Sequence, residues 1–486
     1  MNLVVVGGGF SGVSVAVQVA RYAPQPVRIT IVEPEAQLGR GLAYSTPDPD
    51  HRLNGPFFTH SVDPLDTNDG DRWAQRNNLL EEDPDAQCAT GIFPRRRDFA
   101  RYLADAVAVH AAANPSRSSI KHQRNRVVAI ERGATGLLVQ LDDGTALPAD
   151  QVVLAIGNPP PRLPAMLQAW ADHPALLGSP WQPGGLRGID ADARVTVMGS
   201  SLTAADVLAT LMRQQHRGPI TVFSRRGLRP REQRPPDPNA PASPAASWLV
   251  DRINGQVPEF LAAVLRSKPG ARELTRAVRQ EIAACVARGE AWQAAFDGLR
   301  DVVWQVWPHL PVVEQRRFLR HLRPWYDVHR FRMSPPTTTL IDPAVARGQI
   351  RFMAARLDRI ASAPAEEAAG LQVSVIDRQE QTLTLATDAF VNCSGLDLTG
   401  RPRPGSLPAR LLADGLLQPN PNGLGFLVAP GSNEVLAADG RPVTGLRLVG
   451  PPSAGCYGDP LGAMFIAVQI RRMLPTLWPA TETAQH

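Results

Sequence analysis

The sequence predicts an α/β protein built from two strand–turn–helix–strand units, with a helical segment inserted in the second. Two observations support this fold class. A buried strand runs into a glycine-rich turn and a helix at the start of the chain, and the same order returns near residue 195. From about 248 to 333 the apolar residues instead recur at three- and four-residue spacing, which is typical of helices.

The first unit has the full pattern of a Rossmann-like dinucleotide-binding βαβ unit. A strand precedes Gly7, Gly9 and Gly12, a helix follows them, and the next strand ends at Glu33. Gly7 makes the tight turn, Gly9 lets the backbone approach a pyrophosphate, and Gly12 lets the helix pack on the strand. The pyrophosphate would meet the positive end of the helix. Glu33 follows Gly7 by 33 − 7 = 26 residues, near the spacing of the acid that bonds a ribose hydroxyl.

The place of this unit in the chain favours FAD over NAD as its ligand, because flavoproteins with two dinucleotide domains usually place the FAD unit first. A glycine-rich run at 38–45 follows Glu33 and would wrap the ribityl chain and pyrophosphate of the flavin. The cofactor contacts expected from the first unit are Gly7, Gly9, Ser11, Gly12, Glu33, Arg40 and Gly157.

The second unit keeps the turn but changes its residues. Its strand runs to Gly199, and Ser201 and Ala204 stand where the first unit has Gly9 and Gly12. The next strand ends before Arg225 and Arg226, and 225 − 199 = 26 repeats the earlier spacing. Arginine at this place suits a 2′-phosphate, so NADPH is the predicted second nucleotide, with NADH left open. The expected contacts are Gly199, Ser201, Arg225 and Arg226.

Each unit is followed by a β-meander that feeds a strand ending in a small-residue turn. The first meander leads to Gly157 and the second leads to Gly395. Open α/β sheets bind ligands at such turns, although any β-meander ending in glycine would look the same. The predicted domains are 1–165, the first part of the FAD domain; 190–350, the NADPH domain with a helical insertion at about 248–333; and 351–486, the return to the FAD domain with a final helix beginning near Leu461.

Charge and cysteine usage exclude several classes of protein. The net charge is +5, with 51 basic and 46 acidic residues, which suits an anionic cofactor or substrate but is too small an excess for nucleic acid. The four cysteines lie far apart, with no C-x-x-C, so we expect no metal site, no disulfide framework and a cytoplasmic location. The sequence has no stretch of about 18 uncharged apolar residues, so we expect no membrane span.

Two nucleotide sites without a dithiol favour one class of reaction. In that class NADPH reduces FAD, and the reduced flavin reacts with molecular oxygen and transfers one oxygen atom to a substrate. A non-catalytic flavin-binding redox sensor is the alternative suggested by Ser201 and Ala204. An oxidase that does not use NADPH would leave the second unit unexplained.

Four segments carry a resemblance to a known group of proteins: 39–45, 51–54, 216–228 and 325–332. They resemble the FAD/NAD(P)-binding group that contains FAD-dependent urate hydroxylases and aspartate N-monooxygenases. The resemblance implies an NADPH-dependent flavin monooxygenase. The modest chain length is more similar to the urate hydroxylase branch, which converts urate to 5-hydroxyisourate in purine degradation. The alternative is N-hydroxylation of aspartate or another small amine, and the entry into the final helix departs from the group's pattern.

The last of these segments supplies the candidate substrate residues. Spacing of three and four places Tyr326, His329 and Arg330 on one helical face, where they could orient an anionic substrate such as urate over the flavin. We take these three as the catalytic candidates, with Asp327 and Arg332 as further substrate-side candidates. An alternative is an intrahelical ion pair between Asp327 and Arg330 on a solvated face.

Three further polar residues are candidates near the flavin. Asp459, at the entry to the final helix, is expected to contact the cofactor. His51 and Asn54 follow the glycine-rich run and would either line the flavin pocket or cap a turn.

Overall fold

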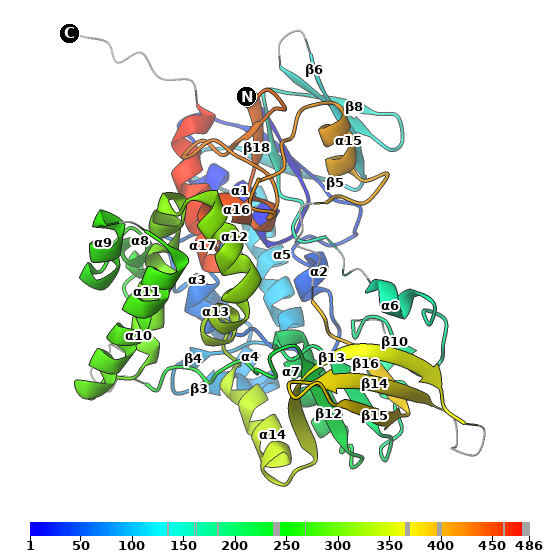
Figure 1. Ribbon diagram of the computed structural model, residues 1–486. Coiled ribbons are helices and arrows are strands. Elements are labelled where there is room, and N and C mark those ends of the chain that lie inside the picture. The colour runs from blue at the N-terminus through cyan, green and yellow to red at the C-terminus, as the bar shows by residue number, and fades with distance from the viewer. Residues whose placement is uncertain are drawn as a thin grey trace, which may run out of the picture.

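Two sheets with helices packed around them form the molecule, which confirms the predicted α/β class. In Figure 1 the first sheet lies at the top, the second at the lower right and the helical insertion at the left. The structure is a computed structural model that describes residues 1–133, 136–159, 161, 163–181, 184–236, 244–267, 269–364, 370–395, 401–459 and 462–478. The final helix begins at Ala463 in the described chain, whereas Leu461, where it was predicted to begin, lies outside the described residues.

The first sheet has the order β17-β18-β9-β1-β2-β5, and its neighbours are parallel except for β17. Its strands are β1 (Asn2–Val6), β2 (Arg28–Val32), β5 (Ser119–Gln123), β9 (Gln151–Leu154), β17 (Glu434–Leu436) and β18 (Pro442–Leu448). Strand alternation divides its side chains between two cores. Leu3 and Val5 pack against helices α1 (Phe10–Tyr22), α5 (Arg96–Ala112) and α17 (Ala463–Met473). On the opposite face, Val4 and Val6 pack against β6 (Val127–Arg132), β7 (Leu137–Leu141), β8 (Ala146–Ala149) and α15 (Leu407–Ala413).

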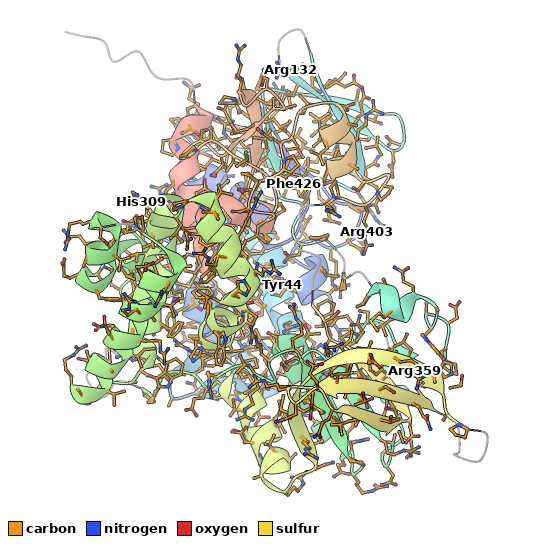
Figure 2. The ribbon with its side chains drawn as sticks, in the orientation of Figure 1. Tyr44, Arg132, His309, Arg359, Arg403 and Phe426 are labelled. Carbon is orange, nitrogen blue, oxygen red and sulfur yellow. The ribbon has the colours of Figure 1, made fainter. Side chains whose placement is uncertain are left out.

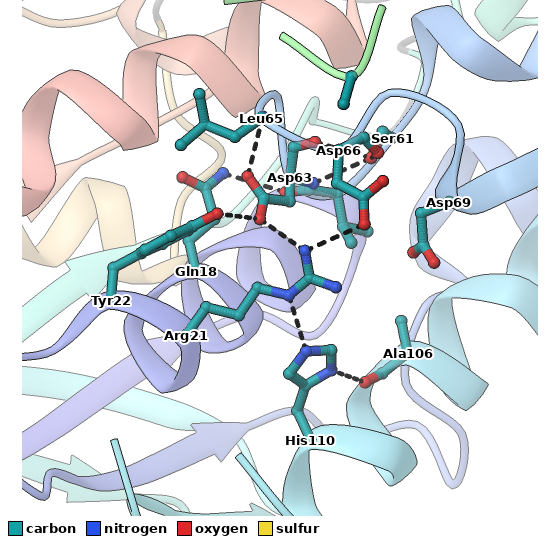
Figure 3. A network of polar contacts seen from close by, with 12 residues as sticks. Gln18, Arg21, Tyr22, Ser61, Asp63, Leu65, Asp66, Asp69, Ala106 and His110 are labelled. Carbon is teal, nitrogen blue, oxygen red and sulfur yellow. Dashed lines mark hydrogen bonds and ion pairs between the residues drawn. The ribbon is translucent and has the colours of Figure 1, made fainter. Parts of the chain in front are cut away.

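A polar network fixes the carboxyl end of α1 (Figure 3). Asp63, fully buried, accepts hydrogen bonds from Arg21 at 2.7 Å and from Tyr22 at 2.6 Å. Arg21 also donates to the ring of His110 on α5, at 2.9 Å. The ring of His110 is in turn held by the Ala106 carbonyl at 2.7 Å. The network ties α1 to α5 and to the loop that contains Asp63, between the 3₁₀ turn Phe57–Thr59 and α3 (Asp69–Arg76).

The second sheet has the order β10-β16-β11-β12-β13-β14-β15. Its strands are β10 (Leu176–Leu177), β11 (Val195–Met198), β12 (Ile220–Ser224), β13 (Ile350–Ser362), β14 (Leu371–Asp377), β15 (Thr382–Thr387) and β16 (Ala389–Asn392). The first five strands in this order are parallel, and β14 and β15 add antiparallel pairs. Helices α7 (Leu202–Arg213) and α14 (Pro335–Ala346) pack together over its core.

Part of the predicted domain division is wrong. Residues from 351 were expected to return to the first domain, but β13 pairs with β12 and β16 pairs with β11. The chain returns to the first sheet only with α15 and β17. Within each unit the predicted echo is present, because β9 lies beside β1 just as β16 lies beside β11.

The helical insertion lies within the second unit in sequence but packs on the first in space. Its helices are α8 (Trp248–Ile253), α9 (Glu259–Arg266), α10 (Ala271–Ala287), α11 (Gln293–Val306), α12 (Val312–His321) and α13 (Arg323–Arg330). Leu249 and Ile253 of α8 form one apolar cluster with Phe465 and Val468 of α17. Figure 1 shows α17 beside the insertion. The insertion therefore packs on the first unit through α17.

Polar contacts along α7 join the two units. Arg96 of α5 lies 2.8 Å from Asp206, and both side chains are largely buried. Thr210 donates to Asp48 at 3.0 Å, and Arg213 pairs with Asp50.

Short elements complete the described fold: α2 (Gly41–Tyr44), α3 (Asp69–Arg76), α4 (Leu79–Glu82), β3 (Gln87–Cys88), β4 (Gly91–Ile92), α6 (Ala165–Gln168), α16 (Ala454–Tyr457) and single 3₁₀ turns at Phe57–Thr59, Pro84–Ala86, Gly185–Gly188, Trp307–His309, Pro451–Ser453 and Leu474–Leu477. Among the described residues, no helix combines the length and apolar character that crossing a membrane requires.

Candidate cofactor and substrate site

The first glycine turn is closely packed against its neighbours. Gly7 has φ +105°, and a Cβ there would lie 2.5 Å from the carbonyl oxygen of Ala155 at the end of β9. A Cβ at Gly12 would overlap the carbonyl oxygen of Gly7. Both positions therefore require glycine, one for its positive φ and the other for the contact of helix with strand. The turn ends at the amino end of α1, whose first N–H groups have no intrahelical acceptor.

A cavity of about 430 Å³ runs along the carboxyl edge of the first sheet. Residues at or just beyond the ends of five strands line it: Gly7 after β1, Glu33 after β2, Asn125 after β5, Gly157 after β9 and Pro451 after β18. The carboxyl edge of an open parallel sheet, beside a helix amino end, is where this architecture binds dinucleotides. An elongated ligand lying across all five strand ends fits this shape.

The polar groups of this cavity suit a nucleoside. One Glu33 oxygen accepts a hydrogen bond from the Gly8 amide at 2.8 Å and the other from the Glu35 amide at 3.1 Å. A carboxylate has further lone pairs for ribose hydroxyls. The buried amide oxygen of Asn158 also lines the cavity and has no hydrogen-bond partner within the described residues, so it is an acceptor available to a ligand. Arg403, labelled in Figure 2, belongs to the same lining.

The glycine-rich run folds back over the first turn. The Gly39 amide donates to the Gly8 carbonyl at 2.7 Å, and a Cβ on Gly41 would lie 3.4 Å from the Cα of Gly9. Arg40 is exposed next to this approach, where it could contact a pyrophosphate. The side chain of Ser11 is buried against Gly450, so its contribution to a cofactor would come through its backbone amide.

The second turn has the same construction as the first. Gly199 has φ +106°, and a Cβ there would overlap the carbonyl oxygen of Cys393 at the end of β16. Ser201 is the N-cap residue of α7, but its side chain makes no capping hydrogen bond. The N–H groups at the amino end of the helix are therefore available to an anion. Arg225 and Arg226 follow β12, both exposed, and neither side chain makes an ion pair with the described residues. This second site therefore combines a helix amino end with two available guanidinium groups.

The candidate substrate residues on α13 do not all lie together. Arg330 donates to Asp459 at 2.8 Å, and the Tyr326 hydroxyl lies 3.3 Å from the same carboxylate. His329 does not share this contact with Asp459, because its ring stacks on Phe296 with centroids 4.7 Å apart.

The alternative of an intrahelical ion pair between Asp327 and Arg330 is not what the structure shows. Asp327 pairs with Arg323 one turn earlier, at 3.3 Å, whereas Arg330 is directed to Asp459. Arg332 is buried and pairs with Asp297 at 2.9 Å, so it supports the helical insertion. Asp459 lines a neighbouring cavity of about 450 Å³ between α17 and the insertion, and it does not line the cavity along the first sheet.

The Arg330–Asp459 ion pair lies where α13 meets α17. A Cβ on Gly462, the N-cap of α17, would lie 3.0 Å from a guanidinium nitrogen of Arg330. The guanidinium also lies over the ring of Phe465, 5.2 Å from its centroid. A helix amino end and an arginine at one place favour an anionic group. Burial, together with the nearby Asp459 carboxylate, raises the pKa of Tyr326 well above its usual value, so its hydroxyl stays protonated.

His60 also lies in this region, and sequence analysis did not identify it. Burial, aided by the charge of Arg330, lowers its pKa to about 4. Its Nδ1 lies 3.1 Å from the Pro56 carbonyl, which leaves Nε2 as the acceptor of the neutral ring. The ring packs edge-on against Phe99, as does Tyr44, which lies between the two units in Figure 2. A single histidine in a loop carries no periodic or spacing signal, so only the fold reveals it.

Of the two alternatives for His51, lining the flavin pocket or capping a turn, the first has no support from the cavity along the first sheet, whose lining does not include this residue. The ring is buried between the units, with Nδ1 2.8 Å from the Thr46 hydroxyl and Nε2 3.4 Å from that of Thr210. Asn54 accepts a hydrogen bond from Gln233 through its backbone carbonyl at 2.7 Å. Both residues support the junction of the two units. Within the described chain, no three His, Cys, Asp or Glu residues are grouped so that they could hold a metal ion.

These two turns and the two sheets that carry them define the class of fold. It is the fold of proteins with two Rossmann-like domains that bind FAD and NAD(P). Residues 4–159 match the family model described as FAD-NAD(P)-binding, which makes the first unit a domain of that kind. Residues 88–236 match the model of L-lysine 6-monooxygenase/L-ornithine 5-monooxygenase. Each match covers less than half of the chain, and no curated protein matches it.

Several solved structures share the whole architecture at low sequence identity. The ornithine N-hydroxylase of Kutzneria sp. 744 is 17% identical, with a TM-score of 0.61 and 98% of each chain covered. The L-lysine 6-monooxygenase of Pseudomonas syringae is 15% identical, with a TM-score of 0.58 and again 98% of each chain covered. The cadaverine monooxygenase of Erwinia amylovora, solved with FAD, is 11% identical, with a TM-score of 0.61; 98% of this chain and 94% of that chain are covered. Identities this low establish the shared fold and nothing finer.

Proposed function

We propose that the protein is a FAD-dependent, NADPH-consuming monooxygenase that hydroxylates the nitrogen of a small amine. The observation that carries the proposal is the pair of equivalent glycine turns, one followed by Glu33 and the other by Arg225 and Arg226. The first suits FAD, and the second suits the 2′-phosphate of NADPH. The match of residues 88–236 to the lysine and ornithine monooxygenase model supports nitrogen as the reacting atom.

The comparisons favour an amine over urate as substrate. The similar structures include proteins named for ornithine, lysine and cadaverine, all of which carry a primary amine. Urate hydroxylation, the other activity implied by the sequence resemblance, has no support among them. We therefore favour the N-hydroxylating alternative, with an amino acid or a diamine as the substrate class.

The bound flavin, once reduced by NADPH, would supply the oxygen chemistry, and the chain would supply position and charge. We propose that Arg330 and the amino end of α17 hold the carboxylate of an amino-acid substrate. The protonated Tyr326 hydroxyl and the Arg330 guanidinium both meet Asp459, which keeps their orientation fixed. Neutral His60 offers Nε2 as a hydrogen-bond acceptor for an N–H group.

The proposal is tested by measuring NADPH oxidation with ornithine, lysine, aspartate, cadaverine and urate, and by determining the mass of each product. We expect an amino acid to accelerate NADPH oxidation and to gain one oxygen atom on nitrogen. Acceleration by urate alone, with a hydroxylated purine as product, would reject N-hydroxylation and keep the monooxygenase class. Failure to bind NADPH would reject both and favour the redox sensor.

Two sets of variants assign the residues in this assay. Arg330→Met combined with Asp459→Asn, which leaves no buried carboxylate unpaired, should raise KM for an amino acid about 10- to 100-fold, the loss of one charge-assisted contact, and leave a diamine without a carboxylate nearly unaffected. Arg225→Ala with Arg226→Ala should raise KM for NADPH over a similar range while leaving kcat and the KM for NADH nearly unchanged. Arg351→Ala removes an exposed arginine on β13 of the same sheet and is the matched control. It should leave the KM for NADPH and the KM for NADH unchanged.

A further inference from the structure

Two adjoining cavities lie in the helical insertion, apart from both glycine turns. One is an open groove of about 720 Å³ between α10 and α12, called here the basic groove. The other is an apolar cavity of about 180 Å³ among α10, α11, α12 and α13. Thr275 and Leu322 belong to the walls of both, so the apolar cavity adjoins the groove at these two residues.

The basic groove gathers positive charge on two helix faces. Arg272, Arg276 and Arg279 recur at i, i+4 and i+7 along α10 and therefore share one face. Arg317 and His321 face them from α12. The lining contains no aspartate or glutamate. The three arginines of α10 are exposed and make no ion pair with the described residues, whereas Arg317 pairs with Glu314.

The apolar cavity has the size and lining of a hydrocarbon site. Its apolar wall is made by Leu274, Val278, Ile282, Phe296, Leu299, Val303, Val306, Trp307, Leu310, Phe318, Leu322 and Trp325. The other lining residues are Thr275, Tyr326, His329 and Gly458. An apolar cavity of roughly 150 Å³ stays dry and binds benzene, so a cavity of 180 Å³ accepts a short alkyl chain or one aromatic ring. An ammonium or a second carboxylate would lose most of its hydration in this largely apolar cavity.

We propose that these cavities together bind an amphipathic anion, with its apolar body in the apolar cavity and its carboxylate in the basic groove. Neither half is sufficient. Exposed arginines gain little from a single small anion, because water and salt screen the interaction. The cavity alone would accept any hydrocarbon of suitable size. Joined at Thr275 and Leu322, the two select molecules with both features, such as a medium-chain carboxylic acid. The site lies mainly on the helical insertion; Tyr326 and Gly458 in its wall adjoin Asp459, but the binding does not depend on the proposed reaction.

Calorimetric titration of the full chain with octanoate tests the proposal. Acetate, which has the same head group without the chain, and octanol, which has the chain without the charge, are the companion probes. We expect octanoate to bind at least tenfold more tightly than either, and its affinity to fall as salt is raised. Equal affinity for octanoate and octanol would reject the role of the basic groove. No binding of octanoate would reject the site.

Variants separate the two halves of the site. Arg276→Gln with Arg279→Gln, on the surface of α10, should weaken octanoate at least tenfold and leave octanol unchanged. Leu299→Trp fills the apolar cavity and should weaken both, provided that its thermal unfolding stays close to that of the unmodified protein. The matched control is Arg132→Gln with Arg359→Gln, two exposed arginines remote from the insertion in Figure 2. Equal loss of octanoate binding in this control would assign the effect to net charge and overturn the proposal.

Discussion

His60 keeps a neutral ring because the fold covers it and places Arg330 nearby. Both influences disfavour the imidazolium and lower its pKa from 6.5 to about 4. Between these two pH values the unfolded chain binds a proton that the folded protein does not. The free energy of unfolding therefore falls as the pH drops from 6.5 towards 4, and this contribution levels off below 4.

His60→Phe should remove this part of the pH dependence. Phenylalanine retains the edge contact with Phe99 but cannot take a proton. We expect the stability loss between pH 6.5 and pH 4 to shrink by up to about 3 kcal/mol, the equivalent of the pKa shift at about 1.4 kcal/mol per unit. Urea unfolding at several pH values measures the difference from the unmodified protein. His309→Phe, an exposed position on the insertion (Figure 2), should leave the pH profile unchanged.

At the scale of elements, α5 and α7 hold the two units together through a buried ion pair. Arg96 and Asp206 lie 2.8 Å apart where little solvent reaches them. A buried pair is not strongly stabilising in itself, since both charges lose hydration, but a single charge left without its partner is costly. The pair therefore acts mainly to fix the position of α7 relative to α5.

The double variant at this junction should be more stable than either single variant. Arg96→Met or Asp206→Leu alone should lower the free energy of unfolding by about 3–5 kcal/mol, because each leaves a buried charge unpaired. The double variant should recover most of that loss. Chemical denaturation of all three measures the coupling. The exposed pair of Arg217 and Asp192 is the control, and its removal should change stability by no more than about 1 kcal/mol.

Elements set by local pattern were predictable, and those set by distant pairing were not. The turn from Gly7 to Gly12 and the strand ending before Arg225 have local signatures, and both lie where the spacing placed them. That β13 continues the second sheet depends on its pairing with β12, more than 120 residues earlier, and no local pattern reports it.

The same limit applies to the candidate site. Arg330 was identified from its helix, but its partner Asp459 comes from a segment 129 residues away. Helical spacing placed His329 beside Tyr326 and Arg330, yet its ring turns towards Phe296. Which residues face each other across an interface depends on tertiary packing, and the periodicity along one helix gives no information about it.

On the scale of the whole molecule, the first unit is assembled from both ends of the chain. β18 completes its parallel sheet beside β9, and Gln18 of α1 donates to the carbonyl of Ala467 on α17 at 3.1 Å. Ala467 and Ile470 belong to the same core as Leu3 and Val5. Pro451 and Phe426, from the same late part of the chain, line the candidate FAD cavity.

A chain ending after Pro404 should therefore fail to retain FAD. It lacks β18 and α17, so one side of the first core and part of the cavity wall are missing. The flavin absorbance of the purified protein measures retention, and we expect it to fall at least tenfold relative to the full chain. A chain ending after Trp478 keeps both elements and should retain FAD fully; loss of flavin there would place the requirement outside this core.

This assembly from both ends also sets an order of events during synthesis. Until β18 leaves the ribosome, β9 is the outer strand of a growing sheet, with Val152, Val153 and Leu154 beside unpaired backbone groups. At about 5–20 residues per second, this exposure lasts roughly 15–60 s. An apolar outer strand pairs readily with other chains. The nascent protein is therefore most vulnerable to aggregation late in translation, after the second sheet has been made and before the first is closed.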